Sequence, residues 1–127
     1  MIKNILVVDN EDYLREVIAM TLTELTFVVS EANSASEAIT KFYELGHTFD
    51  LVITDVAMPG VSGPELIKKI SSYDQNFSKV IFITGLFELP LEAKDFEKID
   101  LKIKILFKPF LMSELVATIL EMGKNKD

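Results

Sequence analysis

The sequence predicts an α/β fold: a single doubly wound, five-stranded parallel sheet in the order 2-1-3-4-5. Short apolar runs without polar interruption, such as residues 5–8 and 51–53, are typical of strands buried on both faces. Stretches with apolar residues at helical spacing alternate with these runs, which implies parallel strands joined by right-handed crossovers. In this strand order the chain reverses direction between the first and third strands. A crevice is therefore expected at their carboxyl ends.

The size and composition fit one domain. The chain has 127 residues, of which 49% are hydrophobic, and we expect one domain over residues 1–123 with a polar tail at 124–127. No cysteine is present, which excludes thiol catalysis and disulfides and favours a cytoplasmic setting. No apolar stretch approaches the length of a membrane span, and no signal peptide precedes the first strand pattern. A formal charge of −7 disfavours direct binding to nucleic acid.

Each element has its own pattern. Ser34 with Glu37 and Ser62 with Glu65 form capping boxes that predict the starts of two helices. Lysines alternate with aliphatic residues over 102–107, which suits an edge strand. The pattern predicts strands at residues 5–8, 27–29, 51–55, 80–83 and 102–107, and helices at residues 14–25, 34–45, 62–72, 91–98 and 115–122.

Polar residues stand where four of these strands end. Asp9 and Asp55 end the first and third strands, which are neighbours about 4.8 Å apart in the predicted order. Thr84 ends the fourth strand and Lys108 the fifth, and only a long side chain such as lysine reaches back to Asp55. We expect these side chains to share one site. The alternative is that Asp55 only opens a loop, since aspartate favours turns through local hydrogen bonds.

Four segments resemble a known family. They are VVDNE at residues 7–11, DLVITDVAMPGVSGPEL at 50–66, IFITG at 81–85 and FKPF at 107–110. Together they resemble the receiver domain of response regulators in two-component phosphorelays, a CheY-like, flavodoxin-like (βα)5 fold. The resemblance covers nearly the whole chain, with the four motifs in order at four strand ends.

The resemblance implies roles for the strand-end residues. Asp55 would accept a phosphoryl group from the phosphohistidine of a histidine kinase or a histidine phosphotransfer protein. Asp9 and Asp55 would hold Mg²⁺ with the Ala57 carbonyl, while Thr84 and Lys108 would contact the phosphoryl oxygens.

The resemblance further implies that the Lys108–Pro109 peptide bond is cis. It also implies a signalling phosphoprotein that switches conformation to control an output domain or effector protein. Such a protein is not an enzyme beyond self-phosphorylation and autodephosphorylation.

The residue chemistry supports these roles independently. A carboxylate accepts a phosphoryl group once a hard divalent cation neutralises the charge that accumulates during transfer. Carboxylates, a carbonyl and waters are the oxygen ligands that Mg²⁺ prefers. Lysine binds phosphate as a mobile point charge. If Lys108 only complements the charge of the aspartates, it still lies in the site.

The sequence departs from the family pattern in three places. The family usually has a second acidic metal ligand after the first aspartate, and this chain has Asn10 there. The Asn10 side chain keeps an oxygen that can bind the metal but loses the negative charge. Glu11 and Asp12 are candidates to supply that charge. Ile105 replaces the usual switch aromatic. The span from Thr84 to the lysine is slightly long, and we expect its apolar segment, residues 86–91, to be the element that responds to phosphorylation.

Two other functions remain open. A phosphohydrolase of the haloacid-dehalogenase type also uses a strand-end aspartate, a Thr-Gly and a lysine. This chain has Glu11 where that family has aspartate, has no acidic pair after the lysine and has no room for a cap domain. A pseudo-receiver that only docks partners, without phosphorylation, is favoured by Asn10 and Ile105. Phosphorylation in the presence of Mg²⁺ separates it from a true receiver.

Overall fold

The sheet has the predicted topology. The structure, a computed structural model, describes residues 1–44, 49–85 and 100–124. All paired strands are parallel, in the order β2-β1-β3-β4-β5, which confirms the predicted fold class. The strands are β1 (Asn4–Val8), β2 (Val28–Ala32), β3 (Leu51–Asp55), β4 (Lys79–Thr84) and β5 (Lys102–Phe107).

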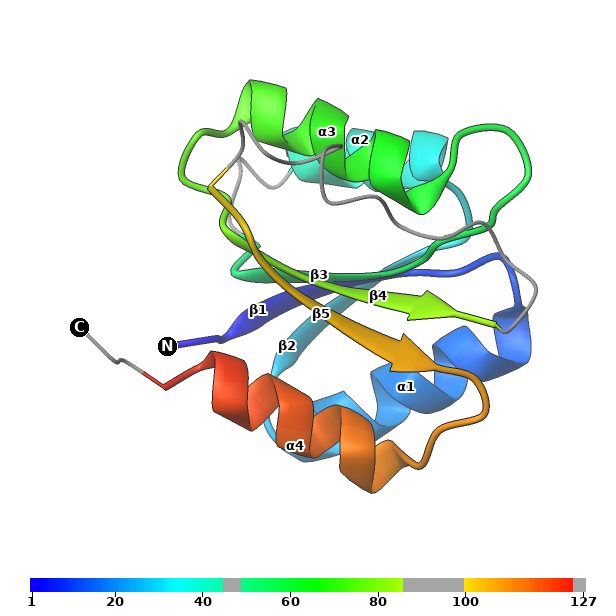
Figure 1. The fold of residues 1–127 in the computed structure, drawn as a ribbon, viewed down its shortest axis with the longest axis vertical. Coiled ribbons are helices and arrows are strands. Elements are labelled where there is room, and N and C mark those ends of the chain that lie inside the picture. The colour runs from blue at the N-terminus through cyan, green and yellow to red at the C-terminus, as the bar shows by residue number, and fades with distance from the viewer. Residues whose placement is uncertain (45–48, 86–99, 125–127) are drawn as a thin grey trace.

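Helices cover both faces of the sheet. Figure 1 shows helices above the sheet and helices below it, with the arrowheads of β4 and β5 pointing to the same edge. The upper layer contains α2 (Ala35–Glu44) and α3 (Gly63–Tyr73), and the lower layer contains α1 (Asp12–Glu24) and α4 (Met112–Met122). The helix predicted at 91–98 and the responsive segment predicted at 86–91 lie outside the described residues.

Two apolar cores follow from the alternation of side chains along the strands. Successive side chains of a strand point to opposite faces, so each strand contributes to both cores. In β3, Val52 joins the core beneath α2 and α3, whereas Leu51 and Ile53 join the core against α1 and α4. All five residues of β3 are buried. The strand that carries Asp55 is therefore enclosed on both faces.

The second strand begins later than predicted. We predicted residues 27–29, whereas β2 runs from Val28 to Ala32. The chain first leaves α1 through Thr26, whose φ of 73° lies in the left-handed region, and Phe27 N donates to Leu22 O in closing that helix end. The strand then continues through half-buried polar residues because β2 lies at the edge of the sheet. An edge strand tolerates polar side chains, so the apolar run underestimates its length.

Side-chain caps fix the starts of the upper helices. Ser62 Oγ accepts from Glu65 N at 3.3 Å and the Glu65 carboxylate accepts from Ser62 N, which confirms the predicted capping box of α3. At α2, Glu37 N donates to Ser34 Oγ at 3.1 Å, but the Glu37 carboxylate accepts from Asn33 N. The bond from Glu37 N to Ser34 is thus as predicted, and only the return bond of this capping box goes to the residue before Ser34.

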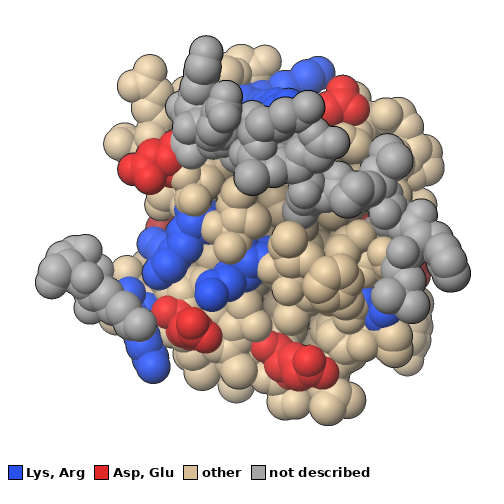
Figure 2. All heavy atoms as spheres, viewed as in Figure 1, with Lys and Arg blue, Asp and Glu red and all other residues tan. Residues whose placement is uncertain are grey.

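The described surface mixes charges of both signs. On the face that carries β5 and α4, Figure 2 shows basic and acidic side chains interspersed with uncharged ones. None of the described helices is long and apolar enough to cross a membrane.

Candidate functional site

Polar side chains are buried at the carboxyl edge of the sheet, at the ends of three neighbouring strands. Asp9 directly follows β1, while Asp55 and Thr84 end β3 and β4, and they are 1%, 2% and 8% exposed. The register brings them together, because Val8 pairs with Thr54 and Asp55 pairs with Ile83. Buried charged groups are rare unless they have partners. This edge is therefore the candidate functional site.

Lys108 reaches this site from the edge strand. Its Nζ lies 3.2 Å from Asp55 Oδ2 and 3.1 Å from Glu11 Oε1. The backbone supports this position, since Lys108 N donates to Thr84 O at 2.8 Å and the Lys108–Pro109 peptide bond is cis. Burial lowers the pKa of Lys108, but the carboxylates of Glu11, Asp55 and Asp9 outweigh it and leave this pKa raised. The ammonium stays charged.

Three carboxylates gather around this ammonium. Oxygens of Asp9, Glu11 and Asp55 lie within 4.8 Å of one another. Glu11 N donates to Asp9 Oδ1 at 2.8 Å, and Asp9 Oδ2 is buried without a hydrogen-bond partner in the part of the chain that the structure describes. Burial raises the pKa of Asp9, although the Glu11 N–H and the Lys108 ammonium lower it in part. A buried carboxylate oxygen without a donor suits a hard cation, so the cluster is consistent with a metal site.

Close backbone packing holds the loop that follows Asp55. Val56 N donates to Ile83 O, and Gly63 N donates to Val56 O, both at 2.9 Å. A Cβ at position 63 would overlap the Asp55 carbonyl oxygen, so only glycine lets α3 begin this close to β3. The start of α3 and the end of β3 therefore form one rigid support for the Asp55 carboxylate.

Arg15 is a structural part of the site that the sequence analysis did not identify. Its Nη1 donates to Asp9 O at 2.8 Å and also lies 2.8 Å from the Asp12 carboxylate, while its Nε lies 3.2 Å from Glu31. These three contacts tie the loop after β1 to α1 and β2. The signal in the sequence was the Asp12 and Arg15 pair, which lies at i, i+3 in the first turn of a helix.

The structure brings together most of the residues predicted from the sequence. Asp9, Asp55 and Lys108 form one charged cluster, and Thr84 lies at the same edge, with its hydroxyl donating to Gly85 O at 3.3 Å. Asn10 and Ala57 are solvent-exposed on the loops after β1 and β3.

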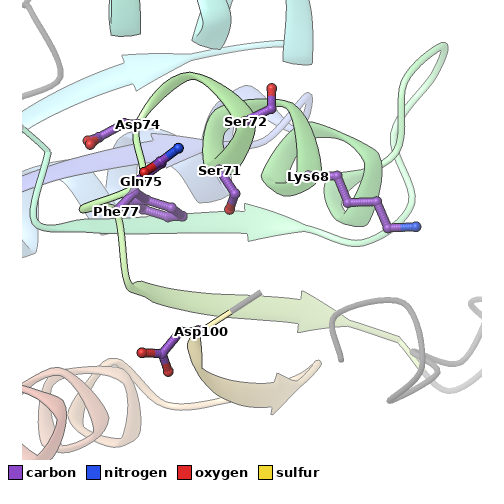
Figure 3. A pocket seen from close by; sticks show the side chains of 7 residues that line it. All are labelled: Lys68, Ser71, Ser72, Asp74, Gln75, Phe77 and Asp100. Carbon is purple, nitrogen blue, oxygen red and sulfur yellow. The ribbon is translucent and has the colours of Figure 1, made fainter. Parts of the chain in front are cut away.

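A separate cavity of about 390 Å³ opens at the opposite end of the sheet. Residues at the end of α3 line it together with Phe77 and Asp100, and Figure 3 shows Ser71 pointing from α3 toward the strands. Asp100 precedes β5 and Phe77 precedes β4, so the cavity lies at the amino ends of these strands. The carboxylate cluster and Lys108 are at the carboxyl ends, and we assign the candidate site there because, among the described residues, it is Asp9, Glu11 and Asp55 whose carboxylates lie close enough together to share a metal ion.

Comparisons with known proteins decide the family. The family model described as the response regulator receiver domain matches residues 5–120. This chain belongs to the receiver domain family. It is 33% identical to the sensor kinase CckA of Brucella abortus, over 97% of this chain and 13% of that protein. It is 30% identical to the chemotaxis protein CheY of Thermotoga maritima, over 96% of this chain and 98% of that protein.

A solved complex shares the fold. The CheX-CheY-BeF3-Mg²⁺ complex of Borrelia burgdorferi contains a chain that aligns with a TM-score of 0.80 at 23% identity, over 97% of this receiver and 90% of that chain. Receiver domains belong to two-component signalling and are signalling modules rather than enzymes. The acidic cluster of this receiver fits a phosphorylation site of such a module.

Proposed function

We propose that this receiver accepts a phosphoryl group on Asp55 from the phosphohistidine of a histidine kinase or a histidine phosphotransfer protein. The observation that carries the proposal is the position of Lys108. Its ammonium lies 3.2 Å from the buried Asp55 carboxylate, at the sheet edge where Asp9 and Thr84 also end their strands. A carboxylate beside an ammonium and two further carboxylates suits binding of a phosphoryl group together with a cation.

In the transfer step, one Asp55 carboxylate oxygen forms a bond to phosphorus while the bond between phosphorus and the donor's imidazole nitrogen breaks. The electron pair of the broken bond returns to that nitrogen. Lys108 is close enough to Asp55 to stabilise negative charge on the phosphoryl oxygens, and the Thr84 hydroxyl is the proposed second donor.

Mg²⁺ is the proposed cofactor. Asp9 and Asp55 are the proposed carboxylate ligands, with the Ala57 carbonyl and the Asn10 side-chain oxygen as neutral ligands. When bound, the ion neutralises charge that builds up on the transferring group. Support comes from the oxygen-rich cluster, from the buried Asp9 oxygen that has no partner among the described residues, and from the Mg²⁺ named for the Borrelia complex.

The proposed setting is the cytoplasm, with the chain acting through a partner or output domain rather than by binding nucleic acid itself. The excess of acidic residues supports the second point, because a net charge of −7 repels a phosphate backbone. The chain spans 13% and 49% of its first two curated relatives. Its proposed domain limits are residues 1–123, with a tail at 124–127.

The experiment is self-phosphorylation with a small donor. Incubation with acetyl phosphate and Mg²⁺ should add the mass of one phosphoryl group to the wild type, and Asp55→Asn should abolish the addition. Asp50→Asn is a matched control, because the Asp50 carboxylate accepts from Lys3 N and Asn4 N at the other end of β3. Equal labelling of Asp55→Asn and wild type would refute the assignment.

The labelling experiment separates a pseudo-receiver from a receiver, and an assay of phosphate release separates a phosphohydrolase from both. A pseudo-receiver would take up no phosphoryl group with or without Mg²⁺, although it would bind a partner. A phosphohydrolase would release inorganic phosphate from phosphate esters over many turnovers, whereas a receiver takes up one group per chain.

A further inference from the structure

Glu11 has an unusual position for an exposed side chain. Its carboxylate is 59% exposed, yet it reaches into the site and lies 3.1 Å from Lys108 Nζ. The same Nζ lies 3.2 Å from Asp55 Oδ2, so one ammonium bridges an exposed and a buried carboxylate. Glu11 N also donates to Asp9 Oδ1. Glu11 therefore contacts the cluster through its backbone and through its side chain.

The neighbouring position carries no charge. Asn10 offers at most a neutral amide oxygen, and its residue is exposed to solvent. Without Glu11, the cluster would hold two carboxylates, Asp9 and Asp55. Cation affinity at an oxygen site rises with the number of charged ligands. The third carboxylate within 4.8 Å is that of Glu11, and the buried Asp9 Oδ2 still lacks a donor among the described residues.

We infer that Glu11 exchanges partners: its carboxylate contacts Lys108 in this structure and becomes the third carboxylate ligand when a divalent cation binds. This inference rests on the proposed metal-assisted function and names the residue that supplies the third charged ligand. An exposed glutamate on a flexible stem can turn from one cation to another at low cost, which the enclosed Asp9 and Asp55 cannot do.

The exchange has an electrostatic consequence for Lys108. The ammonium and the divalent cation attract the same oxygens of Glu11 and Asp55, so each opposes the binding of the other. Binding of the cation would release Lys108 from Glu11 and leave its ammonium available to the phosphoryl oxygens. Glu11 thereby acts as a positioning residue for Lys108 as well as a metal ligand.

The test measures metal binding without any phosphoryl donor. Isothermal titration calorimetry with Mg²⁺, and with Mn²⁺ as a second probe, is compared for the wild type, Glu11→Gln and Asn10→Ala. Asp12→Asn is the matched control, because it removes the same charge one residue away from a carboxylate that is 73% exposed and lies against Arg15. We expect Glu11→Gln to weaken binding about tenfold or more, the effect of one strong interaction. Asn10→Ala removes a proposed neutral ligand and should weaken binding by a smaller factor than Glu11→Gln does, while Asp12→Asn should weaken it less than about threefold.

A second variant tests the competition. Lys108→Met should tighten cation binding about tenfold, because the competing ammonium is gone. When Lys108→Met is added to Glu11→Gln, it should tighten cation binding far less than it does in the wild type, since the two residues are coupled. Far-ultraviolet circular dichroism and thermal unfolding verify that each variant is folded.

The outcomes separate this inference from the proposed function. If the wild type binds cation and Glu11→Gln binds it equally well, or Asn10→Ala loses more affinity than Glu11→Gln does, the inference is wrong even when Asp55 is phosphorylated. Absence of cation binding by the wild type also overturns it. If Glu11→Gln weakens binding as expected while acetyl phosphate leaves the wild type unlabelled, the inference stands and the phosphoacceptor proposal fails.

Discussion

The central strand β3 and the edge strand β5 both end at the site but differ in their surroundings. All five residues of β3 are buried, whereas in β5 no residue is fully buried and Ile105 and Phe107 are 41% and 60% exposed. The strand that brings Asp55 is fixed by two cores. The strand that brings Lys108 is at the edge of the sheet and has one neighbouring strand in the part of the chain that the structure describes. The carboxylate thus belongs to the rigid part of the domain, and the ammonium reaches it from the periphery.

This difference suits the proposed chemistry. A nucleophile that must meet phosphorus in line gains from rigid placement, because a small misplacement costs rate. A lysine that changes partners gains from a long stem on a strand that is only half enclosed. If the two strands are as unequal as their burial indicates, the same substitution must have unequal effects in each.

The largest expected effect comes from one matched pair of truncations. Ile53→Ala removes a fully buried side chain in β3 and should lower the free energy of unfolding by about 3–4 kcal/mol through lost burial and a cavity. Ile105→Ala in β5 should lower it by about 1 kcal/mol or less, since that side chain is already 41% exposed. Urea unfolding followed by circular dichroism measures both, and equal costs would contradict the comparison.

A second pair concerns the loop that supports Asp55. Gly63→Ala places a Cβ against the Asp55 carbonyl oxygen and should cost about 3 kcal/mol, because backbone on both sides must shift. Gly60→Ala should cost only about 1 kcal/mol, from the positive φ of 82°, since a Cβ there meets nothing within 4 Å. Thermal unfolding of the two variants checks the order. A larger loss for Gly60→Ala would mean that α3 moves away from β3 easily.

The third prediction concerns the charge buried beside β3. Asp9→Asn should raise the free energy of unfolding by about 1 kcal/mol at neutral pH without divalent cations, because it removes a buried carboxylate that faces two others.

The direction of the pH dependence follows from the raised pKa of Asp9, which burial causes. The folded state then holds this proton more tightly than the unfolded chain does, so ionisation of Asp9 destabilises the fold as pH rises above its ordinary value of 3.8. Asparagine does not titrate. The stability gain of Asp9→Asn should therefore be smallest below that pH and largest above the raised pKa, and urea unfolding across this range measures it. A gain independent of pH would show that charge is not its cause.

The sequence was most informative where one local pattern dominates. The apolar run before Asp55 predicted a buried central strand, and Ser62 with Glu65 predicted the start of α3, because burial on two faces and helix capping depend on adjacent residues. The meeting of Asp9 with Asp55 followed from the strand order, since parallel strands present their carboxyl ends at one edge.

Other features depend on contacts between distant segments and gave weaker signals. The bridge from Lys108 to Glu11 joins residues 97 positions apart, and the same two residue types are common on solvated surfaces. Arg15 likewise matched an ordinary helix pair with Asp12, and only the fold revealed its contact with the Asp9 carbonyl. The length of β2 was underestimated because polar residues at a sheet edge leave no apolar run.

The smallest expected effect is at the outer side of β5. Lys104 Nζ lies 3.7 Å from Glu121 of α4, with the two side chains 43% and 60% exposed. Solvent screens such a pair, and fixing two long side chains costs entropy, so Glu121→Gln should change the free energy of unfolding by less than about 0.5 kcal/mol. Urea unfolding at low and high salt measures this change. A loss several times larger, and one that disappears in high salt, would mean that charge at the edge does stabilise β5. The edge strand would then be held in place by α4, and Lys108 would approach Asp55 from a support nearly as firm as β3.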